Sequence, residues 1–122
     1  LHERRQVSGF LATRHTRDVI ARFSLVQPGA VDRISKFPRL RWDGLCPTLR
    51  AGTASDRGSY QAARPIHPSE HRVITTREAA RLQGFPDWFQ FHPTKWHSFR
   101  QIGNSIPPPL AESVLSSFRK MF

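Results

Sequence analysis

Residues 72–111 read RVITTREAARLQGFPDWFQFHPTKWHSFRQIGNSIPPPLA and decide the fold. Thr75 precedes a run of helix-favouring residues, and Glu78 follows it by three positions, which is the spacing of a capping box. The helix is expected over about residues 76–83. Gly84 is well placed as the left-handed residue that ends such a helix. The middle of the chain therefore predicts a short helix with both of its ends specified.

A second helix start is predicted at the three consecutive prolines 107–109, because proline is tolerated in the first turn of a helix. Apolar residues then recur at helical spacing at Leu110, Val114, Leu115 and Phe118. Gly103, Asn104 and Ser105 are expected to form a tight polar turn at the N-terminus of this helix. Such a turn suits a ligand with polar or carboxylate groups.

The loop expected between the two helices is rich in aromatic residues, with six between residues 85 and 99. Aromatic side chains at this density usually fill a core, and a base-stacking surface is the alternative. Upstream, apolar residues at helical spacing predict an amphipathic helix over residues 16–26. Residues 1–12 are expected to fray.

Residues 31–42 interleave arginines with aromatic residues. This pattern suits a segment that grips a phosphate backbone and stacks on bases, and it also suits an extended segment whose aromatics fill a small core. We interpret Arg39 and Arg41 as DNA contacts and leave both roles open for Phe37. Further along, Thr48 and Arg50 are the DNA contacts expected.

Short strands are predicted between these segments. Residues 47–50 suit a strand, and residues 60–66 and 72–74 suit the two strands of a hairpin that leads into the capped helix. His67 and His71 lie in or beside the hairpin loop. Because no other ligand types accompany them, no metal site is expected.

Composition indicates an anionic partner. The 122 residues carry a formal net charge of +10, and 16 of the 19 basic residues are arginine. Arginine suits bidentate contact with phosphates and guanine edges, so nucleic acid is the partner that the charge favours. A solvated, arginine-rich surface without a ligand is the alternative.

Cysteine content and hydropathy exclude several other classes. Cys46 is the single cysteine, which excludes an internal disulfide and a cysteine-rich zinc site. No apolar run is long enough to span a membrane, and no signal peptide is visible, so a cytoplasmic protein is expected. Because the chain begins with Leu1 instead of methionine, we expect a fragment or a partial reading frame.

Three stretches carry a resemblance to a known family. TREAARLQGFPDWF (residues 76–89) and QIGNSIPPPLAESV (residues 101–114) resemble the last two sequence motifs of the DNA (cytosine-5)-methyltransferases, in the right order and spacing. WDGLCPTLRAG (residues 42–52) resembles the end of that family's target-recognition region. The resemblance spans about residues 42–114.

The resemblance implies a chemistry and a set of site residues. The family transfers a methyl group from S-adenosylmethionine to C5 of a cytosine that is flipped out of double-stranded DNA and attacked by a cysteine thiolate. Asn104 and Ser105 match the motif whose turn meets the methionine end of the cofactor, with Gly103 allowing the tight backbone. Arg77, Glu78 and Arg81 match the motif that organises the recognition domain and are expected to be structural.

The family's catalytic motifs are not found in this sequence. Its glycine-rich cofactor loop, its Pro-Cys nucleophile and its Glu-Asn-Val acid have no match. Cys46 is followed by proline, whereas the family nucleophile is preceded by it, so Cys46 is not assigned as a nucleophile. We therefore expect no catalytic residue here and an inactive isolated chain, and a separate polypeptide with the N-terminal catalytic lobe becomes an expected partner.

These observations lead to one architecture and two functional hypotheses. We expect an α+β chain with a small recognition lobe, made of short strands and a hairpin, over residues 1–74. Residues 75–122 would carry the C-terminal motifs and a helix that completes an α/β methyltransferase lobe absent from this chain. The leading hypothesis is the C-terminal part of a DNA methyltransferase of a restriction–modification system. The alternative is a stand-alone DNA-binding module or remnant, and an RNA-binding role is weaker.

Overall fold

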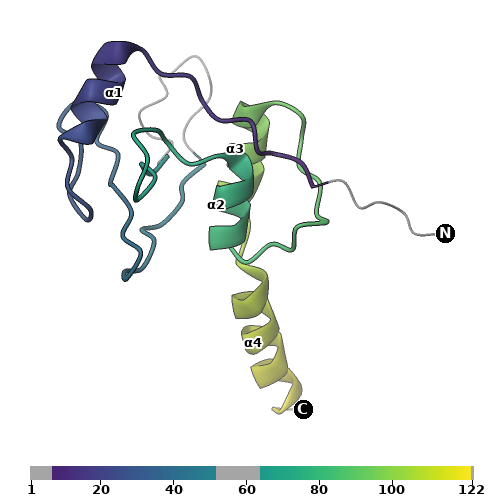
Figure 1. Ribbon diagram of the computed structural model, residues 1–122. Coiled ribbons are helices and arrows are strands. Elements are labelled where there is room, and N and C mark those ends of the chain that lie inside the picture. Colours follow the sequence, from purple (N-terminus) through teal and green to yellow (C-terminus); the bar gives the residue numbers. More distant parts are fainter. Residues whose placement is uncertain (1–6, 52–63, 122) are drawn as a thin grey trace.

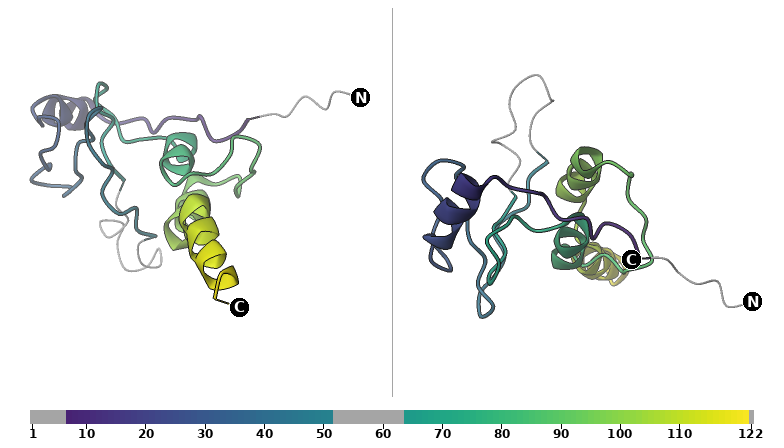
Figure 2. Two further views of the ribbon diagram at one scale, coloured as in Figure 1. Left: turned by 90° about the horizontal axis from the view of Figure 1, so that it is seen from below. Right: turned by 45° about the horizontal axis from the view of Figure 1, so that its top comes forward.

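The computed structural model describes residues 7–51 and 64–121, which form four helices joined by long loops (Figure 1). The helices are α1 (Arg17–Ser24), α2 (Thr76–Leu82), α3 (Lys95–Asn104) and α4 (Pro108–Arg119). Helices α2 and α3 pack on each other, α1 lies at one end of the molecule, and α4 projects from the other (Figures 1 and 2).

The expected strands are not present in the described residues, so the α+β prediction with a hairpin is wrong there. Three isolated bridges take their place, and they join Val31 to Pro38, Arg39 to Ile66, and Ile66 to Val73. Proline has no N–H to extend a ladder, and prolines flank these bridges at positions 38, 65 and 68. Residues 60–63 of the expected first strand lie outside the described residues.

Helix α2 begins as predicted. The Thr75 hydroxyl accepts the Glu78 N–H at 3.2 Å, and the Glu78 carboxylate accepts the Thr75 N–H at 2.7 Å, which completes the capping box. Gly84 follows the helix with a φ of 84°, in the left-handed region expected of it. Local sequence signals therefore fix both ends of α2.

Arg77 is fully buried and ties three parts of the chain together. Its guanidinium donates to the carbonyls of Ser8 at 2.7 Å and Phe89 at 2.9 Å, and its backbone N–H donates to Gly9 at 3.0 Å. Residues 7–12, which were expected to fray, therefore lie across α2 (Figure 2). A buried arginine whose donors meet carbonyl groups is satisfied without a counter-ion.

The core consists of two small clusters. The larger one surrounds the α2–α3 contact and contains Leu40, Leu49, Ile74, Ala79, Ala80, Phe99 and Ile102. The smaller one lies beneath α1 and contains Phe23, Ile66 and Val73, with Phe37 packed against it. The core interpretation therefore holds for Phe37 and for part of the aromatic stretch, whereas Trp88 is 55% exposed.

Helix α3 was not predicted, and its presence changes the position of the polar turn. Gly103 and Asn104 are the last residues of α3, and α4 begins at Pro108 after Ser105 and two further residues. The turn therefore lies at a helix C-terminus, and its placement at a helix N-terminus is wrong. The buried Phe99 and Ile102 hold α3 onto α2, a long-range contact that the proline signal does not report.

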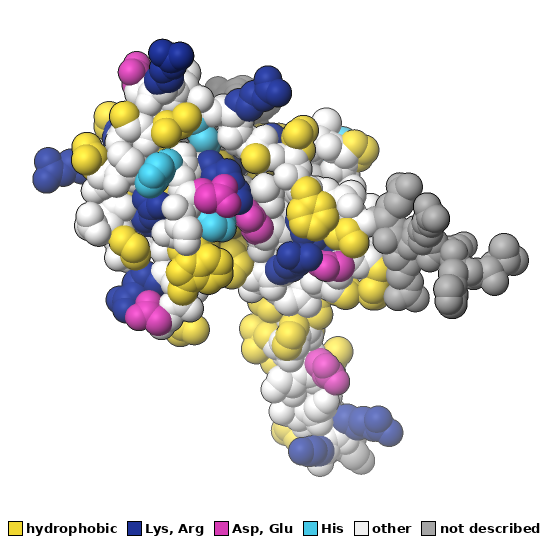
Figure 3. All heavy atoms as spheres, in the orientation of Figure 1, with side chains coloured by type: hydrophobic (Ala, Val, Ile, Leu, Met, Phe, Trp, Pro, Cys, Tyr) yellow, Lys and Arg dark blue, Asp and Glu magenta, His cyan; other side chains and the backbone are white. Residues whose placement is uncertain are grey.

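Helix α4 has no buried residue. Its apolar side chains are largely exposed, at Leu110, Val114, Leu115 and Phe118. Figure 3 shows hydrophobic side chains along this projecting helix. Within the described residues, no helix is long and apolar enough to cross a membrane.

Candidate cofactor groove and DNA-facing surface

A groove of about 450 Å³ forms where three segments of the chain meet. The segments are the loop 46–49, the end of α2, and the connection from α3 into α4. The lining residues are Cys46, Pro47, Thr48, Leu49, Leu82, Gln83, Gly103, Ser105, Ile106, Pro107 and Leu110. The groove therefore brings Thr48, an expected DNA contact, together with Gly103 and Ser105 of the expected cofactor turn.

Gly103 is the point at which these two segments touch. A Cβ atom at this position would lie 2.5 Å from the backbone nitrogen of Ala51 and 2.7 Å from the carbonyl carbon of Arg50. No side chain fits between the two backbones at that distance, so glycine is required for close approach. The turn and the segment 48–51 are consequently held in direct backbone contact.

The turn after α3 is closed by hydrogen bonds to one carbonyl. The Ser105 hydroxyl donates to the Ile102 carbonyl at 2.7 Å, and the Ser105 N–H donates to the same oxygen at 3.2 Å. From α2, the Gln83 amide donates to the Ser105 carbonyl at 2.9 Å and to the Ile102 carbonyl at 3.4 Å. Asn104 is exposed beside this closed turn.

The electrostatics of the turn differ from those that a helix N-terminus provides. The C-terminus of α3 presents the negative end of the helix dipole, which favours cations and N–H donors. The first turn of α4 offers few donors, because residues 107, 108 and 109 are prolines without an N–H. The C-terminus of α3 therefore favours an ammonium group at this turn.

Arg39, one of the four expected DNA contacts, is 5% exposed. Its guanidinium donates to the carbonyls of Phe23 (2.8 Å), Val26 (3.2 Å), Pro68 (3.2 Å) and Glu70 (3.2 Å), and to Nδ1 of His71 (3.4 Å). These five partners match the five N–H groups of a guanidinium. Arg39 thus joins α1 to the loop 67–71, and its donors are occupied within the chain.

The other three expected DNA contacts are exposed. Thr48 lines the groove, and Arg50 follows it two positions along the chain. Arg41 forms a two-point ion pair with Asp43 at 2.9 and 2.7 Å. Hydrogen bonds from Arg41 hold the pKa of the Asp43 carboxyl below its ordinary value. Because this pair is fully exposed, the guanidinium is free to exchange the carboxylate for a phosphate at little cost.

Trp42 lies beside Arg41 and is 78% exposed, yet its indole is fixed in position. Its ring N–H donates to the Ser69 hydroxyl at 2.8 Å, and its ring meets that of His67 edge-on, with 5.8 Å between centroids. An aromatic surface with a satisfied polar edge is typical of a binding interface.

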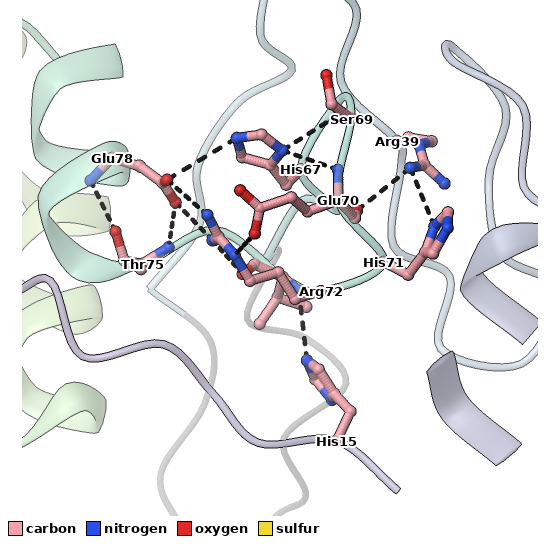
Figure 4. A network of polar contacts seen from close by, with 10 residues as sticks. His15, Arg39, His67, Ser69, Glu70, His71, Arg72, Thr75 and Glu78 are labelled. Atoms are coloured by element: carbon pink, nitrogen blue, oxygen red, sulfur yellow. Dashed lines mark hydrogen bonds and ion pairs between the residues drawn. The ribbon is translucent and has the colours of Figure 1, made fainter. Parts of the chain in front are cut away.

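The loop 67–71, whose Ser69 binds the Trp42 indole, is joined to α2 by a network of polar contacts (Figure 4). Nδ1 of His67 accepts the backbone N–H groups of Ser69 at 3.2 Å and Glu70 at 3.0 Å. Arg72 donates to both carboxylate oxygens of Glu78 at 2.9 Å, and this contact lowers the pKa of Glu78 to about 2. The capping residue of α2 therefore also anchors the loop.

Cys46 lines the groove without the features of a nucleophile. Burial raises the pKa of its thiol, and the thiol donates to the Pro47 carbonyl at 3.2 Å. A raised pKa keeps the sulfur protonated and unreactive near neutral pH. In the part of the chain that the structure describes, no group of three or more His, Cys, Asp or Glu residues is placed to hold a metal ion.

Sequence reasoning missed the contribution of Gln83 to the groove. Its amide reaches the carbonyls of Ile102 and Ser105, which lie 19 and 22 positions further along the chain. A polar residue at a helix end is common, so no pattern in the sequence marks it.

The match to known families decides the identity of this fold. Residues 5–120 match the model for C-5 cytosine-specific DNA methylases. The chain belongs to this family. It is 57% identical over 108 residues to the type II methyltransferase M.XorII of Xanthomonas oryzae, which covers 88% of this chain and 26% of that protein. It is also 38% identical over 85 residues to the type II methyltransferase M.AgeI of Thalassovita gelatinovora, covering 70% of this chain and 19% of that protein.

A solved structure supports the same assignment. A putative DNA modification methyltransferase encoded within a prophage of E. coli superposes with a TM-score of 0.79 at 50% identity, over 93% of this chain and 29% of that one. The methylase chain described here thus spans about a quarter of the curated relative M.XorII. These relatives hold the matching segment within one longer polypeptide, so they give no support to a catalytic lobe on a separate chain.

Proposed function

We propose that this chain forms the C-terminal part of a DNA (cytosine-5-)-methyltransferase, where it contributes to DNA recognition and forms one wall of the S-adenosylmethionine pocket. The observation that carries the proposal is the backbone contact between Gly103 and the Arg50–Ala51 peptide. This contact holds the turn of the last family motif against the end of the recognition region. The contact therefore fixes how closely the two segments approach at Gly103.

Asn104 and the residues of the neighbouring groove fit one end of the cofactor, which supplies the methyl group when it is bound. Asn104 offers an exposed amide, and the end of α3 favours an ammonium group through its dipole. Leu82, Ile106 and Leu110 supply an apolar wall beside these polar groups. Ligand sites commonly combine an apolar lining with a few placed polar groups in this way.

DNA is held by the exposed residues of the segment 41–50. Arg41 and Arg50 contact phosphates, Thr48 adds a hydroxyl next to the groove, and Trp42 presents a fixed aromatic surface to the duplex. Phosphate contacts position the protein, and aromatic contacts with bases add affinity. The net charge of +10 provides the attraction over longer distances.

The nucleophile comes from outside the described residues. Cys46 is kept protonated by its surroundings, and its thiol contacts a carbonyl group instead of a base. A thiol in this state does not attack cytosine. We therefore propose that this chain transfers no methyl group until it is joined to the catalytic part of the enzyme.

Methyl transfer to duplex DNA from labelled S-adenosylmethionine tests this function. We expect activity from the complete protein, no activity from residues 1–122 alone, and reduced activity in the complete protein after Asn104→Ala. Ser116→Ala on the exposed surface of α4 is the matched control. Activity from the 122 residues alone would contradict the proposal. A complete protein that binds DNA but never methylates it would favour a stand-alone DNA-binding module.

Duplex binding measured by fluorescence anisotropy tests the DNA-facing surface. Arg50→Ala is expected to weaken binding and to reduce the salt dependence, because one phosphate contact fewer releases fewer counterions. Trp42→Ala is expected to weaken binding about tenfold if one base contact is lost. Arg119→Ala and Trp88→Ala are the controls, since both side chains are exposed away from this segment. Equal losses in variants and controls would place the DNA elsewhere.

A further inference from the structure

We infer that Gln83 is a positioning residue for the cofactor turn, and that its side-chain amide determines how tightly S-adenosylmethionine is held. This inference rests on the proposed function, because it assigns the groove to the cofactor. It concerns a residue of α2 that touches the turn, and it does not require Gln83 to touch the reacting atoms.

The contacts of Gln83 join two elements that are far apart in sequence. Its amide nitrogen reaches from the C-cap of α2 to the Ser105 carbonyl at 2.9 Å and to the Ile102 carbonyl at 3.4 Å. Ile102 is fully buried, whereas Ser105 lines the groove. The amide thus fastens the end of the turn at Ser105 to a helix whose own position is fixed by the capping box and by Arg77.

The turn keeps its internal closure when Gln83 is removed. Two donors of Ser105, its N–H and its hydroxyl, both bind the Ile102 carbonyl without help from Gln83. What is lost is the contact between the turn and α2. Because Gln83 and Ser105 are only half-buried, water can replace the amide at the Ser105 carbonyl, and the Ile102 carbonyl keeps its two bonds from Ser105. The free energy of unfolding therefore changes little.

Cofactor affinity is the property that depends on this contact. A turn that is free to shift relative to Leu82 and Leu110, which form the apolar wall, must be ordered again each time a ligand binds. The segment 48–51 contacts Gly103, which lies in α3 and is held by the buried Phe99 and Ile102. Leu49 is itself buried, so the placement of this segment does not depend on Gln83. Loss of the amide should therefore weaken cofactor binding and leave DNA binding unchanged.

Two substitutions in the complete enzyme test the inference. Gln83→Met keeps the length of the side chain and removes both N–H donors, and Gln83→Glu also sets a carboxylate against two carbonyl oxygens. Gln101→Met is the matched control, because Gln101 is an exposed glutamine of α3 whose amide oxygen accepts the His92 N–H outside the groove. The readouts are the Kd for S-adenosylmethionine by calorimetry, the Kd for duplex DNA by anisotropy, the Tm, and the steady-state constants.

We expect Gln83→Met to raise the Kd and the KM for S-adenosylmethionine about fivefold, as the loss of one hydrogen bond implies, and Gln83→Glu to raise them further. The Kd for DNA, the kcat and the Tm should match those of Gln101→Met. Unchanged cofactor affinity would overturn the inference, as would equal losses of cofactor affinity, DNA affinity and Tm, which indicate a purely structural residue. If the unsubstituted enzyme bound no S-adenosylmethionine, the proposed function would fail together with the inference.

Discussion

Helices α2 and α4 differ in where their contacts come from. Helix α2 has 7 residues, four of which are buried, whereas α4 has 12 residues, none of which is buried. Helix length therefore does not explain which of the two is integrated into the core. Its contacts with Ser8, with Phe89 and with α3 all lie within the described residues.

The apolar face of α4 has a different explanation. Leu110, Val114, Leu115 and Phe118 lie at helical spacing, which is the pattern of a helix packed on a core, yet all four are exposed. M.XorII is about four times as long as the segment it shares with this chain. We propose that this face packs on the catalytic part of the complete enzyme, where each buried side chain contributes about 1.5–3 kcal/mol.

The largest effect on stability is expected at Arg77, on helix α2. Arg77→Met removes the fully buried guanidinium that joins α2 to the carbonyls of Ser8 and Phe89. We expect a loss of about 3 kcal/mol in the free energy of unfolding, measured with urea. Arg119→Met on α4 is the control, and it should change stability by less than about 0.5 kcal/mol. If both variants lost a similar free energy of unfolding, α2 would not be more firmly packed than α4.

A smaller effect is expected at the contact between the turn and the segment 48–51. Gly103→Ala places a methyl group 2.5 Å from the Ala51 nitrogen, and the backbones must separate to admit it. We expect about 2 kcal/mol of destabilisation in urea unfolding, together with weaker DNA binding. Gly44→Ala is the control for stability alone, because its added Cβ would lie 3.3 Å from the Cβ of Arg41, a contact that a shift of a few tenths of an ångström relieves. Equal effects of the two changes would show that the backbones are not in contact.

The capping residue of α2 gives a pH-dependent prediction. The pKa of Glu78 is lowered from 4.5 to about 2, chiefly by its hydrogen bonds from Arg72. Its contribution to stability is therefore present above pH 4.5 and is lost as the pH falls toward 2. Because the carboxylate is partly exposed, we expect Glu78→Gln to cost about 1–2 kcal/mol at pH 7 and close to nothing at pH 2.

Urea unfolding of the wild type and Glu78→Gln at several pH values measures this difference. Glu112→Gln, on the exposed surface of α4, is the control, and its difference from the wild type should stay near zero over the same range. A constant difference between wild type and Glu78→Gln would mean that the carboxylate is not coupled to Arg72.

These contrasts also explain what the sequence predicts and what it does not. The ends of α2 follow from Thr75, Glu78 and Gly84, which act within one or two turns of the helix, and both ends were predicted. The family motifs were also recognisable, because each is a contiguous stretch of sequence. Helix α3 was missed because its anchors, Phe99 and Ile102, are recognisable only once α2 is in place.

The candidate site shows the same limit. Arg39 has the composition of a DNA contact, yet a pocket of carbonyls from α1 and the loop 67–71 encloses it. The role of Gln83 depends on a carbonyl 22 residues away. The strands were overestimated because β-favouring residues lie between prolines, so pairing stops after single bridges. Contacts between distant residues decide the first two cases, and local prolines decide the third.

The smallest effect on folding is expected on α4, and it tests the comparison most directly. Leu115 is 68% exposed, so Leu115→Glu removes no internal contact and should change the free energy of unfolding of the 122 residues by less than about 0.5 kcal/mol. The same change should reduce self-association in sedimentation velocity, because it places a charge in an exposed apolar face. Ser116→Glu adds an equal charge on the opposite side of α4 and serves as the control.

In the complete enzyme, the Tm values of Leu115→Glu and Ser116→Glu show whether α4 packs on the catalytic part or projects into solvent. If the face of α4 packs on the catalytic part, Leu115→Glu buries a charge there and should lower the Tm, while Ser116→Glu leaves it unchanged. An equal Tm for the two variants in the complete enzyme would show that α4 projects into solvent there too. The exposed face would then need another partner, and the contrast with α2 would no longer reflect a division of the molecule between two parts of one enzyme.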